Sequence, residues 1–213
     1  MGLNMKQFAI FLIAACAGST WAAGLESLEN FVKTVKTGRT DFTQVVTVPA
    51  KEGQVARAKT SSGTFEFARP GRFKFTYKKP FAQTIVADGQ TLWLYDVDLN
   101  QVTGRKQAQA LGTTPAALIA SAPDLRALQA DFHLASDGQQ DGVEWVLATP
   151  KAKDNALQSV RVGFRANALA QLDIVDSFGQ KSSLSFQAFQ ANVALEPAIF
   201  KFKPPAGADV IQQ

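Results

Sequence analysis

Phe65-Glu-Phe-Ala-Arg-Pro-Gly-Arg-Phe-Lys-Phe-Thr-Tyr77 is the stretch of sequence that predicts the fold. Apolar and polar residues alternate on both sides of a Pro-Gly dipeptide, which predicts two strands joined by a tight turn. Side chains alternate between the two faces of a strand, so one face is expected to carry the rings of Phe65, Phe67, Phe73, Phe75 and Tyr77. Arg69 has the same parity. A permanent cation is therefore expected at the end of an aromatic face, where it needs oxygen acceptors or water.

The rest of the chain repeats this pattern of short strands and turns. Apolar residues at three- and four-residue spacing predict a helix over residues 24–36. Asp88-Gly89 predicts a hairpin between strands at 83–87 and 91–95. In the middle of the chain, short helices are predicted over 114–120 and from Asp124.

About ten strands joined by hairpin signals predict a mainly β fold, in which one antiparallel sheet curls into a barrel or half-barrel covered by helices. A closed barrel filled by its own side chains and a two-sheet sandwich are the alternatives. Residues 51–59 are expected to form a loose edge or loop, and the turn-rich residues 136–142 a loop between strands. In the strand expected over 181–189, Ala188 is a candidate inward residue.

The N-terminus predicts a secretory signal. Lys6 precedes an apolar run of about ten residues, which is too short for a membrane-spanning helix. Small residues before a cut after Ala22 divide the chain into a signal peptide at 1–22 and a single domain at 23–213. The only cysteine, Cys16, would leave with the signal. A competing hypothesis takes residues 13–16 as a lipobox, with Cys16 lipidated and first in the mature chain.

Composition and motifs argue against several classes of function. The chain has 22 Lys plus Arg against 18 Asp plus Glu, and its basic residues are scattered, which is no nucleic-acid signature. With His133 the only histidine, no Ser-His-Asp set and no histidine cluster for a metal is expected. No glycine-rich phosphate loop occurs, so we expect neither an enzyme nor a cofactor. Sixteen Phe against two Tyr suit an apolar core or an apolar ligand.

Several motifs occur in the order found in one known family. They are residues 87–96 (Ala-Asp-Gly-Gln-Thr-Leu-Trp-Leu-Tyr-Asp), Phe42-Thr43-Gln44, Arg69-Pro70-Gly71-Arg72-Phe73, Thr114-Pro115 with Leu118-Ile119, and residues 204–211 (Pro-Pro-Ala-Gly-Ala-Asp-Val-Ile). Together they resemble the periplasmic outer-membrane lipoprotein carrier family, LolA. The resemblance covers essentially the whole chain after the signal.

The resemblance implies an unclosed antiparallel β-barrel, or half-barrel, with a helical lid over an apolar cavity. The acyl-chain cavity would be lined by Phe65, Phe67, Phe73, Phe75, Tyr77, Trp93, Leu118 and Ile119. Arg69 falls on the arginine of the family's Arg-Pro motif. It would latch the lid by bonding backbone carbonyls near Ile119 and Ala120.

The resemblance also implies a function. Such carriers are periplasmic, take lipoproteins from an inner-membrane ABC transporter, shield their acyl chains and deliver them to an outer-membrane acceptor; a monomer is expected. Each buried methylene is worth about 0.8 kcal/mol, so bare acyl chains need cover in water. The alternatives are the acceptor itself, which shares the fold but is anchored through a lipidated cysteine (here Cys16), a carrier of another lipid, and a barrel-fold enzyme.

Overall fold

The computed structural model describes residues 23–50, 55–110, 122–152 and 156–212, and most of them form one twelve-stranded sheet. The strands are β1 (Thr37–Val48), β2 (Arg57–Ala68), β3 (Arg72–Lys79), β4 (Gln83–Ala87), β5 (Thr91–Asp96), β6 (Gln101–Lys106), β7 (Phe132–Gln140), β8 (Val143–Pro150), β9 (Leu157–Arg165), β10 (Ala168–Asp176), β11 (Lys181–Ala191) and β12 (Asp209–Gln212). The described helices are α1 (Ala23–Thr34), α2 (Gln107–Ala110), α4 (Leu125–Asp131) and the 3-10 turn η2 (Pro197–Phe200).

The sheet is curled but not closed. Its strand order is β12-β6-β5-β4-β3-β2-β1-β11-β10-β9-β8-β7, so β12 and β7 are edges that do not pair with each other. All neighbours are antiparallel except β12, which runs parallel to β6. The predicted fold class, a mainly β half-barrel, is confirmed.

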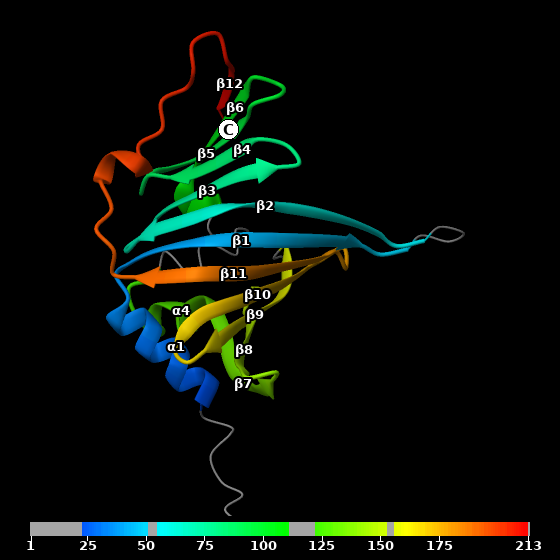
Figure 1. Ribbon diagram of the computed structural model, residues 1–213, viewed down its shortest axis with the longest axis vertical. Coiled ribbons are helices and arrows are strands. Elements are labelled where there is room, and N and C mark those ends of the chain that lie inside the picture. The colour runs from blue at the N-terminus through cyan, green and yellow to red at the C-terminus, as the bar shows by residue number, and fades with distance from the viewer. Residues whose placement is uncertain (1–22, 51–54, 111–121, 153–155, 213) are drawn as a thin grey trace, which may run out of the picture.

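Helix α1 covers one side of the sheet. Its apolar stripe of Leu28, Phe31 and Val32 is buried, and the helix contacts β7, β8, β9 and α4. Figure 1 shows α1 and α4 together beside the second half of the sheet. Asp124 caps α4 as expected, because its carboxylate accepts a hydrogen bond from the Ala127 backbone N–H at 2.9 Å.

One face of the sheet, called the inner face, packs against α1. Directly paired residues of antiparallel strands point to the same side. The pairs Phe65↔Phe75, Phe75↔Ile85 and Ile85↔Leu94 therefore extend the inner face from β2 to β5. Phe31 of α1 contacts it, with its ring centroid 6.1 Å from that of Phe67. The predicted aromatic face is thus the core of the molecule.

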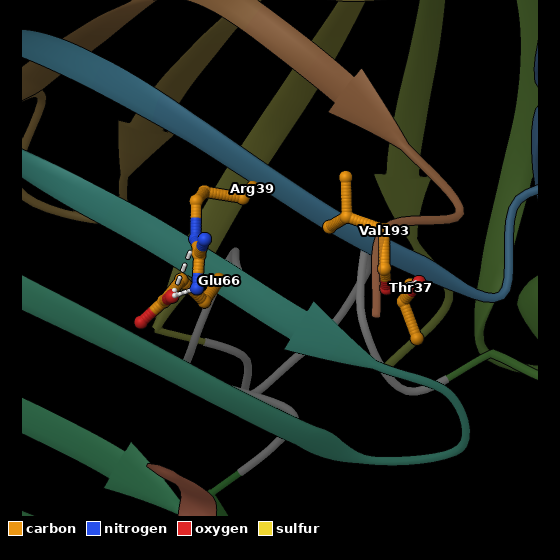
Figure 2. A network of polar contacts seen from close by, with 4 residues as sticks. All are labelled: Thr37, Arg39, Glu66 and Val193. Carbon is orange, nitrogen blue, oxygen red and sulfur yellow. Dashed lines mark hydrogen bonds and ion pairs between the residues drawn. The ribbon is translucent and has the colours of Figure 1, made fainter. Parts of the chain in front are cut away.

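The outer face is polar where the inner face is aromatic. Arg39 of β1 donates through Nε to Glu66 Oε1 of β2 at 2.8 Å, and its Nη2 lies 2.8 Å from the same oxygen (Figure 2). In the same figure, Thr37 Oγ1 donates to the Val193 carbonyl at 2.7 Å, which ties the segment after β11 to the start of β1. The alternation in the sequence therefore separates a filled interior from a solvated exterior.

The antiparallel order gives the sheet two ends. The turn at residues 69–71 and the turn at residues 88–90 lie at one of them, called here the Arg69 end. The turns at residues 80–82, 97–100 and 177–180 lie at the other, called the far end. In Figure 1 the long β1–β2 pair extends to this far end.

Four local expectations were wrong or incomplete. Strand β2 begins at Arg57, inside the segment at 51–59 that was expected to form a loose edge or loop. Strand β7 continues to Gln140, so the loop expected at 136–142 shrinks to a turn at Asp141 and Gly142, both with positive φ. Ala188 is exposed because a bulge, in which its φ is 52°, shifts the register of β11. Strand β12 was missed, since its parallel pairing with β6 is non-local.

Candidate functional site

Arg69 is the buried cation at the end of the inner face. It follows β2, and its side chain is only 9% exposed. Its Nε donates to the Val35 carbonyl and its Nη1 to the Ala122 carbonyl, both at 2.9 Å. Its guanidinium carbon lies 5.4 Å from the ring centroids of Phe31 and of Phe67. One side chain therefore joins the end of α1, the β2–β3 turn and the segment before α4.

The bonding pattern follows from what a helix end and a guanidinium each require. Val35 follows the last turn of α1, where backbone carbonyls lack helical partners and carry the negative end of the helix dipole. A planar guanidinium with five donors suits such acceptors. The Arg69 backbone N–H donates to the Lys36 carbonyl at 2.8 Å, which places the turn against the same helix end. Among the described residues, Nη2 is buried without a hydrogen-bond partner.

Arg69 stays charged at physiological pH despite its burial. Desolvation lowers the pKa of Arg69 from 12.5 to about 10. Because the folded pKa lies below the unfolded one, the buried charge costs stability at neutral pH, and that cost fades only as pH rises above about 10. Arg69 is therefore still protonated near neutral pH, and the carbonyls of Val35 and Ala122 accept hydrogen bonds from a cation.

The aromatic residues predicted as cavity walls lie together on the inner face. Phe65, Phe67, Phe73 and Phe75 are at most 5% exposed, and the rings of Phe65 and Phe75 stack with centroids 4.2 Å apart. Tyr77 continues the row, and burial raises the pKa of its hydroxyl to about 12. In this structure the four phenylalanines fill the interior by packing against one another and against α1.

Trp93 does not belong to this face, so its assignment as a cavity residue is wrong. It pairs with Val86 while its neighbour Leu94 pairs with Ile85, which puts Trp93 on the outer side of β5. There its ring lies 5.6 Å from that of Phe202, and its Nε1 donates to Asp88 Oδ2 at 3.0 Å. Parity on a strand, rather than aromatic character, decides which side chain faces inward.

Two cavities open beside the inner face. A smaller one of about 240 Å³ is lined by Ile85, Leu92, Leu94, Thr103 and Arg105. A larger one of about 820 Å³ lies at the far end of the sheet and includes Tyr77, Gln44 and Val46 in its lining. Leu118, Ile119 and Ala120, predicted as lid residues, and the helix expected over 114–120 lie outside the described residues.

Comparison with known proteins assigns the chain to a family. The sequence model described as outer membrane lipoprotein carrier protein LolA matches residues 33–203. The chain belongs to the LolA family. A relative from Albidiferax ferrireducens, named outer-membrane lipoprotein carrier protein, is 70% identical over 98% of this chain and 100% of the relative. A relative of the same name from Methylibium petroleiphilum is 50% identical over 98% of this chain and 100% of that protein.

Membership of the LolA family confirms the resemblance drawn from the motifs, and this family is one of carrier proteins. Within the described ranges, no helix is long and apolar enough to cross a membrane. In that same part of the chain, His, Cys, Asp and Glu form no group of three or more that could hold a metal ion.

Sequence reasoning on this LolA chain missed Leu92 and Leu94, which line the smaller cavity. A signal for them was present. The Asp88 backbone N–H donates to the Thr91 carbonyl at 3.2 Å, so Gly89 and Gln90 form a two-residue loop. Counting outward from that loop pairs position 87 with 92 and position 85 with 94, which is the observed register.

Gln107 is a second residue that the sequence reasoning missed. It is 3% exposed and lies where β6 passes into α2. Its Nε2 donates to the Gly71 carbonyl at 2.6 Å, and its Oε1 accepts from the Gly89 N–H at 2.9 Å. These two hydrogen bonds therefore link the β2–β3 turn, which carries Arg69, to the β4–β5 turn. No local pattern marks a glutamine for this task, because both partners are distant in sequence.

The Asp88 carboxylate stiffens the second of these turns. Its Oδ1 accepts from the backbone N–H groups of Gln90 and Thr91, both at 2.8 Å. Desolvation raises the pKa of Asp88, but the hydrogen bonds from Thr91, Gln90 and Trp93 outweigh it and leave the pKa below its usual value. This carboxylate contributes stability that is present at neutral pH and is lost as pH falls through its folded pKa.

Replacing Gln107 by Leu tests whether its side chain links the two turns. The change leaves the Gly71 carbonyl and the Gly89 N–H without their partner, so we expect the free energy of unfolding to fall by about 2 kcal/mol in urea titrations. Gln90→Leu, at an exposed position of the adjoining turn, is the matched control and should change it by less than about 0.5 kcal/mol. Equal effects of the two substitutions would contradict the assignment.

Proposed function

We propose that the chain is a periplasmic carrier that shields the acyl chains of lipoproteins from water and delivers them to an acceptor at the outer membrane. The observation that carries the proposal is the apolar cluster on the inner face, which extends from Phe42 of β1 to Leu92 of β5 and is bounded at one end by a buried, bonded arginine. Family membership supports the same function. A carrier of acyl chains needs apolar cover of this kind because exposed methylenes are costly in water.

The cargo would enter by replacing ring-to-ring contacts on the inner face. Phe65, Phe67, Phe73, Phe75 and Tyr77 are proposed as the walls that acyl chains contact once the interior is opened. Leu92 and Leu94 join them, because they share that face and already line a cavity of about 240 Å³. Trp93 is left out, since it lies on the other side of β5.

Arg69 is proposed as the latch that holds the interior shut without cargo. Its bonds to Val35 and Ala122 join α1 to the segment that follows residues 111–121. The predicted acceptors at Ile119 and Ala120 lie outside the described residues, and Nη2 of Arg69 has no partner among those that are described. Cargo would then compete with these bonds, so loading and closing become opposed states of one site.

The partners follow from this role. We infer that an inner-membrane ABC transporter supplies the cargo and that a lipoprotein at the outer membrane receives it. The predicted signal peptide at 1–22 would bring the chain to the periplasm as a single domain of residues 23–213.

An acceptor anchored through Cys16 is the alternative within the same fold, and a carrier of another lipid is a second. The names of the relatives favour the carrier, since each is called an outer-membrane lipoprotein carrier protein. Mass spectrometry of the protein purified from the periplasm and membranes distinguishes the two anchoring states. We expect an unmodified chain beginning at Ala23; an acylated Cys16 at the N-terminus would favour the acceptor.

Arg69→Leu tests the latch. Leucine retains an apolar side chain but donates no hydrogen bond, so the variant should fold, load lipoprotein and fail to hand it over, leaving carrier-bound cargo in the soluble fraction. The assay measures release of a lipoprotein from inner-membrane vesicles and its later transfer to outer-membrane vesicles. We expect transfer to fall at least tenfold while release changes little.

Arg39→Leu is the control for loss of an arginine, because Arg39 pairs with Glu66 on the outer face and makes no contact with the inner one. It should load and transfer cargo as the unmodified chain does. Normal transfer by the Arg69 variant, or an equal loss in the Arg39 variant, would contradict the latch.

A further inference from the structure

The exposed large apolar side chains gather at the far end of the sheet, opposite Arg69. Val48 is 42% exposed at the end of β1, Phe81 58% in the β3–β4 turn, Leu99 70% in the β5–β6 turn and Phe178 88% in the β10–β11 turn. These four side chains are called the apolar rim. The turns at the Arg69 end, such as 88–90 and 141–142, carry no large apolar residue. The rim is therefore a property of one end of the molecule.

The tips of the rim are held in place by specific interactions. Asp96 Oδ1 accepts the Leu99 backbone N–H at 3.1 Å, and Asp176 Oδ1 accepts the Phe178 backbone N–H at 2.9 Å. The ammonium group of Lys59 lies 4.7 Å from the ring centroid of Phe81. Two aspartate side chains thus stabilise turns that expose an apolar residue to solvent. The exposure of that apolar side chain to water costs free energy unless a partner covers it.

The rim surrounds the entrance of the larger cavity. Val48, Phe81 and Leu99 line that cavity of about 820 Å³, and so does Gln180, next to the Phe178 turn. A Cβ placed on Gly179 would lie 3.5 Å from Pro49 Cγ, so the β10–β11 turn reaches the end of β1. The apolar tips therefore stand around one opening rather than at scattered sites.

Cations alternate with the apolar tips. Arg57, Lys59, Lys78 and Lys79 are exposed at this end, and the first two line the cavity. The acids that face them there are Asp96 and Asp98, of which Asp96 is engaged in its own turn. Two basic and two acidic residues thus line the cavity, and Lys78 and Lys79 add two exposed cations beside the Phe81 turn.

We propose that the apolar rim docks on the surface of an anionic phospholipid bilayer, with Phe81, Leu99 and Phe178 inserted at the level of the headgroups. Single apolar side chains on separate turns, interspersed with Lys and Arg, fit the interface of a bilayer, where apolar tips enter the acyl boundary and cations meet phosphates. A peptide partner would instead call for one contiguous groove or an unpaired strand edge. This docking would bring the larger cavity against the membrane.

The inference goes beyond the proposed carrier function and does not depend on it, because its test contains no lipoprotein. Mature protein is mixed with vesicles of phosphatidylethanolamine with phosphatidylglycerol, or of phosphatidylcholine alone, and the bound fraction is measured by flotation. We expect binding to the anionic vesicles that weakens with salt, and weaker binding to the neutral ones.

Substitutions test whether vesicle binding depends on the apolar rim and on the cations beside it. Phe81→Ser combined with Leu99→Ser should weaken binding to anionic vesicles at least about tenfold, since each removes a large apolar side chain from the interface. Lys59→Gln and Lys79→Gln should each weaken it about fivefold. These positions are exposed, so circular dichroism and thermal unfolding should match the unmodified chain.

Val193→Ser combined with Leu195→Ser is the matched control, because both residues are half-exposed apolar side chains in the segment after β11, and Val193 is bonded to the start of β1 at the Arg69 end. It should bind vesicles like the unmodified chain. The proposal is overturned if the unmodified chain binds no vesicles, or if the control loses as much binding as the rim variant. An unmodified chain that binds neither kind of vesicle would assign the rim to a protein partner instead.

Discussion

A guanidinium buried at the end of an aromatic face is the constraint on which the Arg69 end of the structure depends. Its charge cannot be shed near neutral pH, so its donors must find oxygen atoms. They find the carbonyls of Val35 and Ala122, which come from segments far apart in the sequence. The positions of α1, of the β2–β3 turn and of the chain before α4 are therefore linked, and Gln107 fixes the turn from the other side.

The second constraint is the separation of the two faces of the sheet. Register carries the inner face from Phe65 through Phe75 and Ile85 to Leu94, while Trp93 and its partner Val86 face outward. In the half of the sheet under α1, register separates the inner and outer faces in the same way. There Val146 pairs with Val162 inside, and Trp145 covers Gly163 outside. An apolar guest inside would therefore meet phenylalanine, tyrosine and aliphatic side chains, and no tryptophan from these two strands.

The sequence predicted the parts of the fold that depend on local pattern. Alternation around Pro70-Gly71 and Asp88-Gly89 predicted both hairpins, and the parity of Arg69 predicted a cation at the end of the aromatic face, which the structure shows to be buried. The sequence did not predict features that depend on tertiary contacts. The bulge at Ala188 and the parallel pairing of β12 leave no periodic signal, and Gln107 acquires its role only when two turns meet. The error at Trp93 was avoidable, because counting from the Asp88-Gly89 loop places Leu94 inside.

The central claim is that acyl chains bind on the inner face, and tryptophan emission tests it directly. After removal of residues 1–22 the tryptophans are Trp93 and Trp145, both on the outer face. A fatty acid brominated along its chain quenches only the indoles it touches. We expect it to leave the emission of the unmodified mature protein nearly unchanged and to quench the added emission of Leu94→Trp strongly. Strong quenching of the unmodified protein, or none in the Leu94 variant, would contradict binding at the inner face.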